Sequence, residues 1–467
     1  MKRALRNLAA LLIGDLGSRA LGFLVTAYLA RVLDPSGFGL INIGFSVLGY
    51  LVLAATPGMH LVETRNTATM EGDSRERVQT ILSLRSFLAL GLWFVGSILT
   101  LLLPLDSLTR TIIILSSASL IPLAFSLDWF FHGKEQFELI STAKVMNALV
   151  YGIAAYVLVE SPDHVSWVPV AFAAGNVAAS LLYLSQYRRR FGALHLKWRM
   201  HDWKDILRRN LPVGLSVLLA HSTLNLPPIV VGVFLSNADA GMLSAALKVV
   251  FVLLMIDRIL HALFFPVAAR HLSARNPEGV SLVSTVGKLV LAVLLPITVC
   301  AYLLSPVAIS FVFGENYSGA TALLQILLGY FLLTVVNTVF VCALIGSGHE
   351  PEYVRAVNIG SGVLTVAIVV GTLFFGTTGT AVGIVLGELV TVMLMMRGAH
   401  RVLGVSISGI VRTPAAAGLL MGIGAWATAD QHLAVHLVAA CIAYSIGAVA
   451  FRVFDRREFE VLRERFV

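Results

Sequence analysis

Long apolar runs are the feature that most constrains this 467-residue chain. Runs of roughly 18–25 apolar residues, the length that crosses a bilayer as a helix, recur from one end of the sequence to the other. Hydrophobic residues make up 57% of the chain and charged residues 13%, whereas a soluble domain carries about a quarter of its residues as charged. The sequence therefore predicts an all-α integral membrane protein whose surroundings are the lipid bilayer.

The apolar runs and the polar breaks between them predict about fourteen transmembrane helices. Short connections at 34–37 and 236–239 join consecutive spans tightly, and Pro227 and Pro228 are expected to kink or break the seventh span. The expected spans are 8–29, 38–61, 80–103, 111–131, 144–159, 166–184, 211–234, 241–268, 281–304, 319–345, 355–375, 378–396, 413–429 and 433–453.

The Lys and Arg residues between the spans predict the orientation of the chain. If the N-terminus is cytoplasmic, the cytoplasmic segments hold 27 Lys and Arg residues and the opposite segments hold 2, which is a strong positive-inside signal. We therefore expect both termini in the cytoplasm. Asp15 and Arg19 interrupt the first apolar run, so we interpret it as an uncleaved first span and not as a signal peptide. The net charge of +8 reflects this orientation, and no nucleic-acid partner is expected.

The most basic segment, 185–210, predicts the domain organisation. It follows the sixth span and contains eight Lys and Arg residues together with Trp198 and Trp203, a pattern typical of an amphipathic stretch at the lipid headgroups. A shift of 202 residues aligns 33–40 with 235–242, which indicates a parallel repeat. The expected division is a six-helix lobe at 1–184, a basic cytoplasmic linker at 185–210, a second six-helix lobe at 211–396, and two extra helices with a cytoplasmic tail at 397–467.

Charged residues inside the first span are the main functional signal, because ionisable groups at membrane depth usually face a bundle interior or a wet cavity. Asp15 and Arg19 stand four residues apart, on the same helical face as Ser18, Gly22 and Thr26. One interpretation is a self-neutralising ion pair that packs against a neighbouring helix. The interpretation we favour is a polar stripe in which Arg19 meets an anionic group, since Arg suits bidentate recognition of phosphate.

The eighth span repeats this pattern. On a continuous helix, Lys248 and Arg258 lie about 40° to either side of Ser244, so that all three share a broad face. Asp257 is a local partner for Arg258, whereas Lys248 has no acidic neighbour at i±3 or i±4. Lys248 is therefore the stronger candidate for contact with a substrate.

Other embedded groups carry weaker signals. His221 and Asn225 stand four residues apart in the seventh span, and the 202-residue shift places His221 opposite Arg19; a plain interior histidine is the alternative. Glu388 follows a small-residue stripe at Gly379, Gly383 and Gly387, which favours close helix packing. Ion coupling by Glu388, together with Asp257, is the less favoured alternative. Arg85 and Lys288 lie near helix ends and are expected to extend toward the interface.

No enzyme signature accompanies these charges. The chain contains no GxSxG, HExxH or P-loop motif and no paired-carboxylate constellation. The three cysteines lie in apolar runs without metal-ligand spacing. We therefore expect neither catalytic residues nor a metal site nor a cofactor.

Four local segments resemble the polysaccharide (O-antigen type) flippases of the MATE-like exporter superfamily, which groups multidrug, oligosaccharidyl-lipid and polysaccharide exporters. The most specific match is Asp128-Trp129-Phe130-Phe131-His132-Gly133-Lys134-Glu135 at the end of the fourth span. The other matches are 30–39, 56–65 and 313–327. The resemblance covers most of the chain and implies two six-helix lobes around a cationic cavity, alternating access, and a polyprenyl-pyrophosphate-linked oligosaccharide as substrate.

The residues and the resemblance together suggest a flippase in the bacterial inner (plasma) membrane. We expect it to move the lipid-linked oligosaccharide from the cytoplasmic to the outer leaflet for biosynthesis of a surface polysaccharide (lipopolysaccharide or exopolysaccharide), with a polymerase and glycosyltransferases as partners. A peptidoglycan-precursor lipid flippase, a cation-coupled multidrug exporter and a non-transporting scaffold are the alternatives. The expected substrate-binding residues are Arg19, Lys248, Arg258, His221, Asp15, Asn225 and Ser244.

Overall fold

The computed structural model describes residues 2–69, 75–272 and 277–454, and no strand occurs within these ranges. The chain forms two compact units, which we describe separately: residues 1–244 and residues 245–467. The predicted cytoplasmic tail lies outside the described residues from 455 onward. The N-terminal unit contains α1 (Lys2–Ala55), α2 (Met59–Thr69), α3 (Arg75–Leu102), α4 (Ser107–Ala118), α5 (Leu120–Ala124), α6 (Asp128–Gly133), α7 (Phe137–Leu158), α8 (Trp167–Phe191), α9 (Met200–Ala220), α10 (Ser222–Phe234) and the beginning of α11 (Asn237–Leu253).

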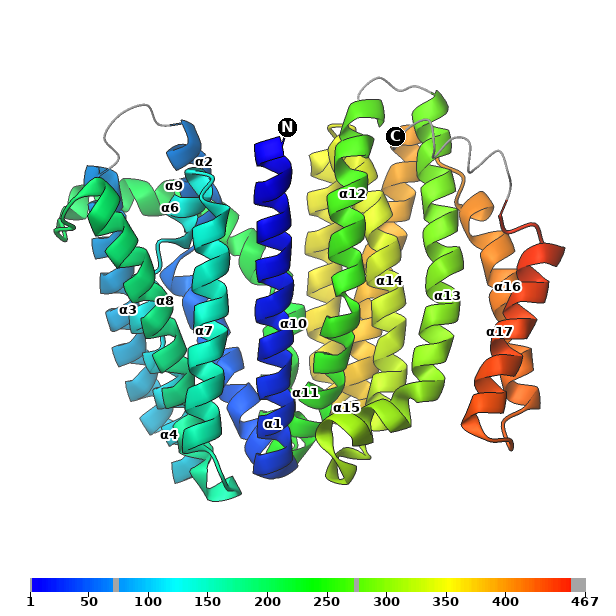
Figure 1. Ribbon diagram of the computed structural model, residues 1–467, viewed down its shortest axis with the longest axis horizontal. Coiled ribbons are helices and arrows are strands. Elements are labelled where there is room, and N and C mark those ends of the chain that lie inside the picture. Colours follow the sequence, from blue (N-terminus) through cyan, green and yellow to red (C-terminus); the bar gives the residue numbers. More distant parts are fainter. Residues whose placement is uncertain (1, 70–74, 273–276, 455–467) are drawn as a thin grey trace. The chain divides into compact units, whose positions relative to one another are not determined.

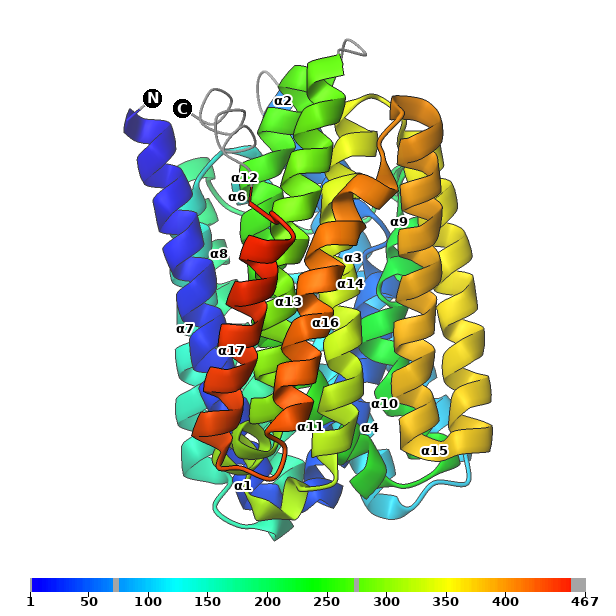
Figure 2. The same cartoon turned by 90° about the vertical axis from the view of Figure 1, so that its right-hand side faces the viewer.

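The C-terminal unit takes up the rest of α11 and consists of long helices (Figures 1 and 2). In Figure 2 the last two helices run side by side. The helices of this unit are α12 (Met255–Leu272), α13 (Pro277–Phe313), α14 (Ala320–Gly346), α15 (Glu350–Leu403), α16 (Ile407–Ala427) and α17 (Leu433–Ala450).

The described helices account for fourteen crossings of a membrane. Ten helical segments are long and apolar enough to cross alone. Two of these, in α1 and α15, contain a non-helical residue at which two helices join, and each therefore makes two crossings. Two further crossings consist of paired shorter helices, α9 with α10 and α11 with α12. The predicted number of spans is confirmed.

The first reversal lies in the predicted short connection at 34–37, and the second lies between the expected spans 355–375 and 378–396. Asp34 has a φ of 62°, Pro35 follows it, and the Asp34 Oδ1 accepts a hydrogen bond from the Gly37 amide at 2.9 Å. In α15 the reversal falls at Gly376, which has a φ of 64°. A glycine suits this position because a side chain disfavours positive φ. Figure 2 shows the two halves of α15 side by side.

The parallel repeat is visible at one close contact within the N-terminal unit. A Cβ atom on Gly39 would overlap the carbonyl of Asn237, and a Cβ atom on Gly241 would overlap the carbonyl of Pro35. Gly39 and Gly241 are separated by 202 residues, as are Pro35 and Asn237. The contact is thus reciprocal, which is what two equivalent hairpins related by a pseudo-twofold axis produce.

Three predicted spans are interrupted in the structure. The fourth span divides into α4, α5 and α6, and α4 ends at Ala118. Ala118 stands four residues before Pro122, and in a continuous helix the proline ring would clash with the Ala118 carbonyl. The seventh is broken at His221, between α9 and α10, so the break precedes Pro227 and Pro228 and does not fall at them. The eighth is interrupted at Leu254, between α11 and α12.

The glycine stripe of α15 serves helix packing, as predicted. A Cβ atom on Gly379 would overlap the Gly371 carbonyl, one on Gly383 would lie 2.6 Å from the Ala367 oxygen, and one on Gly387 would overlap the Leu364 side chain. The absence of side chains lets the two halves of α15 approach to backbone contact.

A buried ion pair joins α2 to α3, in a region that the sequence analysis treated as a loop. The Glu63 side chain is fully buried and accepts hydrogen bonds from the Arg77 Nε at 2.7 Å and Nη2 at 2.9 Å. Such a two-point contact aligns a planar guanidinium with a carboxylate.

Replacing Glu63 with Ala is expected to lower the free energy of unfolding by about 3 kcal/mol, because it removes one partner of a buried pair. Glu352→Gln is the control, since the Glu352–Arg401 pair is long (3.9 Å) and solvent-accessible and contributes less than about 1 kcal/mol. Thermal unfolding of the detergent-solubilised protein measures both effects. Equal midpoints for the two variants would contradict the prediction.

Candidate functional site

The polar stripe of α1 forms the local ion pair that was the alternative interpretation of the sequence. The Arg19 Nε lies 2.8 Å from the Asp15 Oδ2. The Ser18 and Thr26 hydroxyls donate to carbonyls of their own helix, those of Asp15 and Gly22. These hydroxyls are therefore satisfied locally, and the charges carry the chemistry of the stripe.

A second cation shares Asp15. The Lys144 Nζ, on α7, lies 2.8 Å from the Asp15 Oδ1. Two cations paired with one carboxylate give the cluster a net charge of +1, so it does not neutralise itself. Lys144 was not among the predicted site residues because it stands at the very start of the expected fifth span, 144–159, whereas α7 already begins at Phe137. The spacing of Lys144, Asn147 and Tyr151 on one helical face was the signal available.

This Arg19–Asp15–Lys144 cluster opens onto a cavity of about 420 Å³ within the N-terminal unit. Asn147 and Asn176 line the same cavity, and the Asn147 Nδ2 donates to the Asn176 Oδ1 at 3.0 Å. The cavity thus combines the excess cation of the cluster with neutral amide groups and with the Asp128 carboxylate, which His60 pairs at 3.2 Å. The cation and the amides suit a ligand that carries phosphate oxygens and hydroxyls.

A second cavity of about 370 Å³ shares a wall with the first, formed by Leu123, Ser126 and Asp128. Asp128 pairs with the His60 Nε2 at 3.2 Å. His221 also lines this second cavity, so the structure places it as a cavity residue of the N-terminal unit. Of the Asp128-Trp129-Phe130-Phe131 motif, the three aromatic side chains are buried in the core, and Asp128 faces both cavities.

Arg85 was expected to extend toward the membrane interface, but in the structure it turns inward. Its side chain is buried and donates to the carbonyls of Ser126 at 2.8 Å and Leu123 at 3.0 Å. These carbonyls lie at the break between α5 and α6, where the helical hydrogen bonds are lost. Arg85 satisfies them, as irregular backbone within a membrane requires.

The remaining predicted binding residues occupy different environments. Asn225 packs against Gly49, where an added Cβ atom would lie 2.7 Å from the Asn225 Oδ1. Ser244 is buried in α11, and Lys248 of the same helix makes no hydrogen bond or ion pair with any described residue. Arg258 is exposed on α12. Because α11 ends before Arg258, the shared face calculated for one continuous helix does not hold for it.

The structure brings Asp257 and Glu388 onto one polar patch of the C-terminal unit. Thr338 of α14 donates to the Asp257 carboxylate, and the adjacent Asn337 donates to the Glu388 Oε1 at 3.3 Å. The Asn337 Oδ1 is buried and accepts no hydrogen bond within the described residues. Two carboxylates, an amide oxygen and a hydroxyl from α12, α14 and α15 thus lie together. The sequence placed Asp257 and Glu388 131 residues apart, without a pattern connecting them.

The fold is similar to the folds of solved structures that are titled as a flippase and as transporters. The chain is similar to a structure titled lipid II flippase MurJ in an inward closed conformation, with 13% sequence identity over 95% of this chain and 98% of that one and a TM-score of 0.75. It is also similar to an inward-facing multidrug resistance MATE family transporter of the MOP superfamily, with 16% identity over 86% and 98% of the two chains and a TM-score of 0.60. A point mutant of the Vibrio cholerae MATE transporter VcmN matches at 15% identity over 87% and 98%, with a TM-score of 0.53.

A family model identifies the chain more narrowly. The model described as polysaccharide biosynthesis protein matches residues 4–270. The chain belongs to this family, and the predicted resemblance is confirmed. No curated protein sequence matches the chain.

Proposed function

We propose that the protein is a flippase that moves a polyprenyl-pyrophosphate-linked oligosaccharide from the cytoplasmic to the outer leaflet. The observation that carries this proposal is the Arg19–Asp15–Lys144 cluster, an excess positive charge on a cavity inside a membrane-embedded unit. A cation at membrane depth without a full complement of anions is costly, and an anionic substrate offsets that cost. The family membership and the transporter fold support the proposal.

In this mechanism the pyrophosphate meets Arg19 and Lys144, while Asn147 and Asn176 offer hydrogen bonds to sugar hydroxyls. In the C-terminal unit the corresponding cations are Lys248 and Arg258, and in the N-terminal unit His221 of the second cavity is a further contact. The polyprenyl tail stays in lipid, so that only the polar head is desolvated and its charge always has a partner.

Alternating access by the two six-helix lobes at 1–184 and 211–396 completes the proposal. We infer that the protein resides in the bacterial inner membrane with both termini cytoplasmic, because the basic segments fall on one side of the sequence-predicted topology. Glycosyltransferases that build the lipid-linked oligosaccharide and a polymerase that consumes it are the corresponding partners.

Deletion of the gene, with complementation by the intact chain, tests the proposal. We expect loss of surface polysaccharide and accumulation of the lipid-linked oligosaccharide in the cytoplasmic leaflet. Cell lysis with accumulated peptidoglycan precursor would instead indicate the precursor flippase. Increased drug sensitivity with normal polysaccharide would indicate a drug exporter.

We further propose that Asp257 and Glu388 couple transport to a cation gradient. Both carboxylates lie in the C-terminal unit, and the unpartnered Asn337 oxygen beside them adds a third acceptor. Acceptors grouped in an apolar surrounding favour binding of a proton or a monovalent cation, because either reduces the cost of the buried charge.

Glu388→Gln and Asp257→Asn are each expected to reduce gradient-driven transport on the order of tenfold or more, since each removes one negative charge from the patch. Proteoliposomes that contain the lipid-linked oligosaccharide, with an imposed proton or sodium gradient, measure the effect. Glu350→Gln, an exposed carboxylate of the same helix as Glu388, is the matched control. If the imposed gradient still accelerates transport of the lipid-linked oligosaccharide in both patch variants, the coupling role is contradicted.

A further inference from the structure

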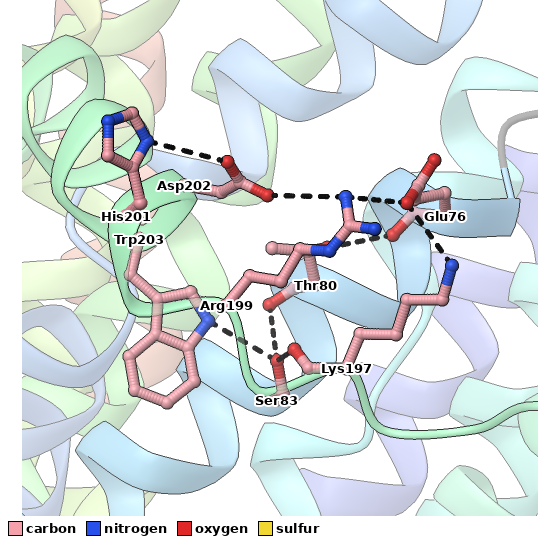
Figure 3. Close-up of polar contacts among 8 residues, drawn as sticks. All are labelled: Glu76, Thr80, Ser83, Lys197, Arg199, His201, Asp202 and Trp203. Atoms are coloured by element: carbon pink, nitrogen blue, oxygen red, sulfur yellow. Dashed lines mark hydrogen bonds and ion pairs between the residues drawn. The ribbon is translucent and has the colours of Figure 1, made fainter.

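The basic linker is fixed against α3 by a small set of specific contacts (Figure 3). Trp203 is buried, and its Nε1 donates to the Ser83 Oγ at 3.3 Å. The Ser83 Oγ also lies 2.6 Å from the Lys197 carbonyl oxygen, to which it donates. Lys197 and Arg199 pair with the Glu76 carboxylate at 3.2 and 2.7 Å. The linker is therefore a docked element with a defined outer face.

The exposed side chains of α3 place this docked segment relative to the bilayer. From Val78 to Ser86 the helix is buried, and from Phe87 to Leu102 it exposes a series of large apolar side chains. At 1.5 Å per residue the exposed part spans about 24 Å, close to the thickness of about 30 Å of a hydrocarbon core. The edge of the hydrocarbon thus lies near Phe87.

Trp198 lies at this edge. Its ring centroid is 6.5 Å from that of Phe87 and 5.6 Å from that of the buried Trp203. The Trp198 side chain itself is 56% exposed. Tryptophan concentrates at the membrane interface because its ring is apolar and its N–H is polar.

The exposed face of helix α9 changes from charged to apolar side chains along its length. Lys204, Arg208, Leu211 and Leu215 are all exposed and stand at i, i+4, i+7 and i+11, on one helical face. The opposite face, at 203, 206 and 210, is buried. Along the exposed face, two cations give way to two leucines, which is the pattern of a helix that passes from the headgroups into the hydrocarbon.

The two cations of this face are free to bind a ligand. Neither Lys204 nor Arg208 has a hydrogen-bond or ion-pair partner among the described residues. The neighbouring Arg209 lines a cleft that also contains Asp202 and Asp205, so its charge is partly balanced there. Lys204 and Arg208 therefore carry the positive potential of the exposed face.

We propose that Trp198, Lys204 and Arg208 form a binding surface for anionic phospholipid headgroups of the adjacent leaflet. The two cations take the lipid phosphate, and the indole packs beside the first carbons of the acyl chains. This surface is separate from the substrate cavities, and the inference holds whichever lipid-linked cargo the protein carries.

The test titrates the full-length protein in detergent with phosphatidylglycerol and with phosphatidylcholine, and counts bound lipids by native mass spectrometry. We expect tighter binding of phosphatidylglycerol, weakened when the salt concentration rises. Lys204→Gln/Arg208→Gln is expected to lower the apparent affinity for phosphatidylglycerol roughly 10- to 30-fold. Arg65→Gln/Lys134→Gln, which removes the same charge elsewhere in the N-terminal unit, leaves it unchanged.

An unchanged affinity in Lys204→Gln/Arg208→Gln, or an equal loss in both double variants, would overturn the proposal. The charge-preserving Lys204→Arg/Arg208→Lys keeps the preference if charge is the cause. If the unmodified protein shows no salt-sensitive preference for phosphatidylglycerol over phosphatidylcholine, the proposed binding surface is refuted without any variant.

Discussion

Arg19→Ala is expected to abolish surface polysaccharide while the protein remains in the membrane at its normal level. The change leaves Asp15 paired with Lys144 at 2.8 Å, so the cluster loses its excess charge and becomes neutral. A pyrophosphate that enters the cavity would then be desolvated without a charged partner, and losing a charge-assisted contact of this kind costs several kcal/mol. We expect export to fall on the order of 100-fold, measured as polysaccharide on the cell surface against protein level in the membrane.

A second variant separates charge from packing. Arg19→Ala/Asp15→Asn removes the pair but leaves Lys144 as an uncompensated cation, so the excess charge returns. If the excess charge is what binds the substrate, the double variant exports more than Arg19→Ala. If the Arg19–Asp15 pair serves only to pack α1, the double variant is no better than the single one. Normal export in Arg19→Ala would refute the assigned role outright.

Gly39→Ala is expected to disrupt the N-terminal unit at the contact between the two hairpins. The added Cβ atom would overlap the backbone carbonyl of Asn237, and backbone cannot move aside as a flexible side chain does. Overpacking of a close contact typically costs about 1–3 kcal/mol, and we place this case at about 3 kcal/mol. We expect a lower midpoint of thermal unfolding and reduced transport in this variant.

Gly91→Ala provides the matched control, because nothing lies within 4 Å of the Cβ atom it would add. Replacing an unconstrained helical glycine with alanine is neutral or slightly stabilising. Since Gly241 makes the reciprocal contact with Pro35, Gly39→Ala/Gly241→Ala should cost less than the sum of its single variants. A Gly39→Ala protein as stable as Gly91→Ala would contradict the reciprocal contact.

Much of the fold was predictable because the relevant signals are local. An apolar run long enough to cross a bilayer forms a helix whatever its neighbours are, since no water is present to satisfy its backbone. The reversal at Asp34 and the pairing of Asp15 with Arg19 also depend only on residues a few positions apart. The break after α4 follows from the ring of Pro122, whereas the break at His221 lies six residues before Pro227 and is not explained by that ring.

The functional groups were less predictable, because a sequence does not say what stands opposite a helix face. Lys144 became a partner of Asp15 only through the packing of α7 against α1. Arg85 turned inward because the break between α5 and α6 left carbonyls that needed a donor.

The sequence by itself therefore determined that this is a membrane protein of about fourteen helices, that Arg19 and Asp15 stand one helical turn apart on the same face, and that small residues allow α15 to pack on itself. Only the tertiary structure decided that the Asp15 cluster carries an excess cation and that Asp257 and Glu388 share one patch. The physical reason is the range of the interactions. Hydrophobic length and i,i+4 spacing act within one helix, whereas the charge of a site is the sum over side chains that distant segments bring together.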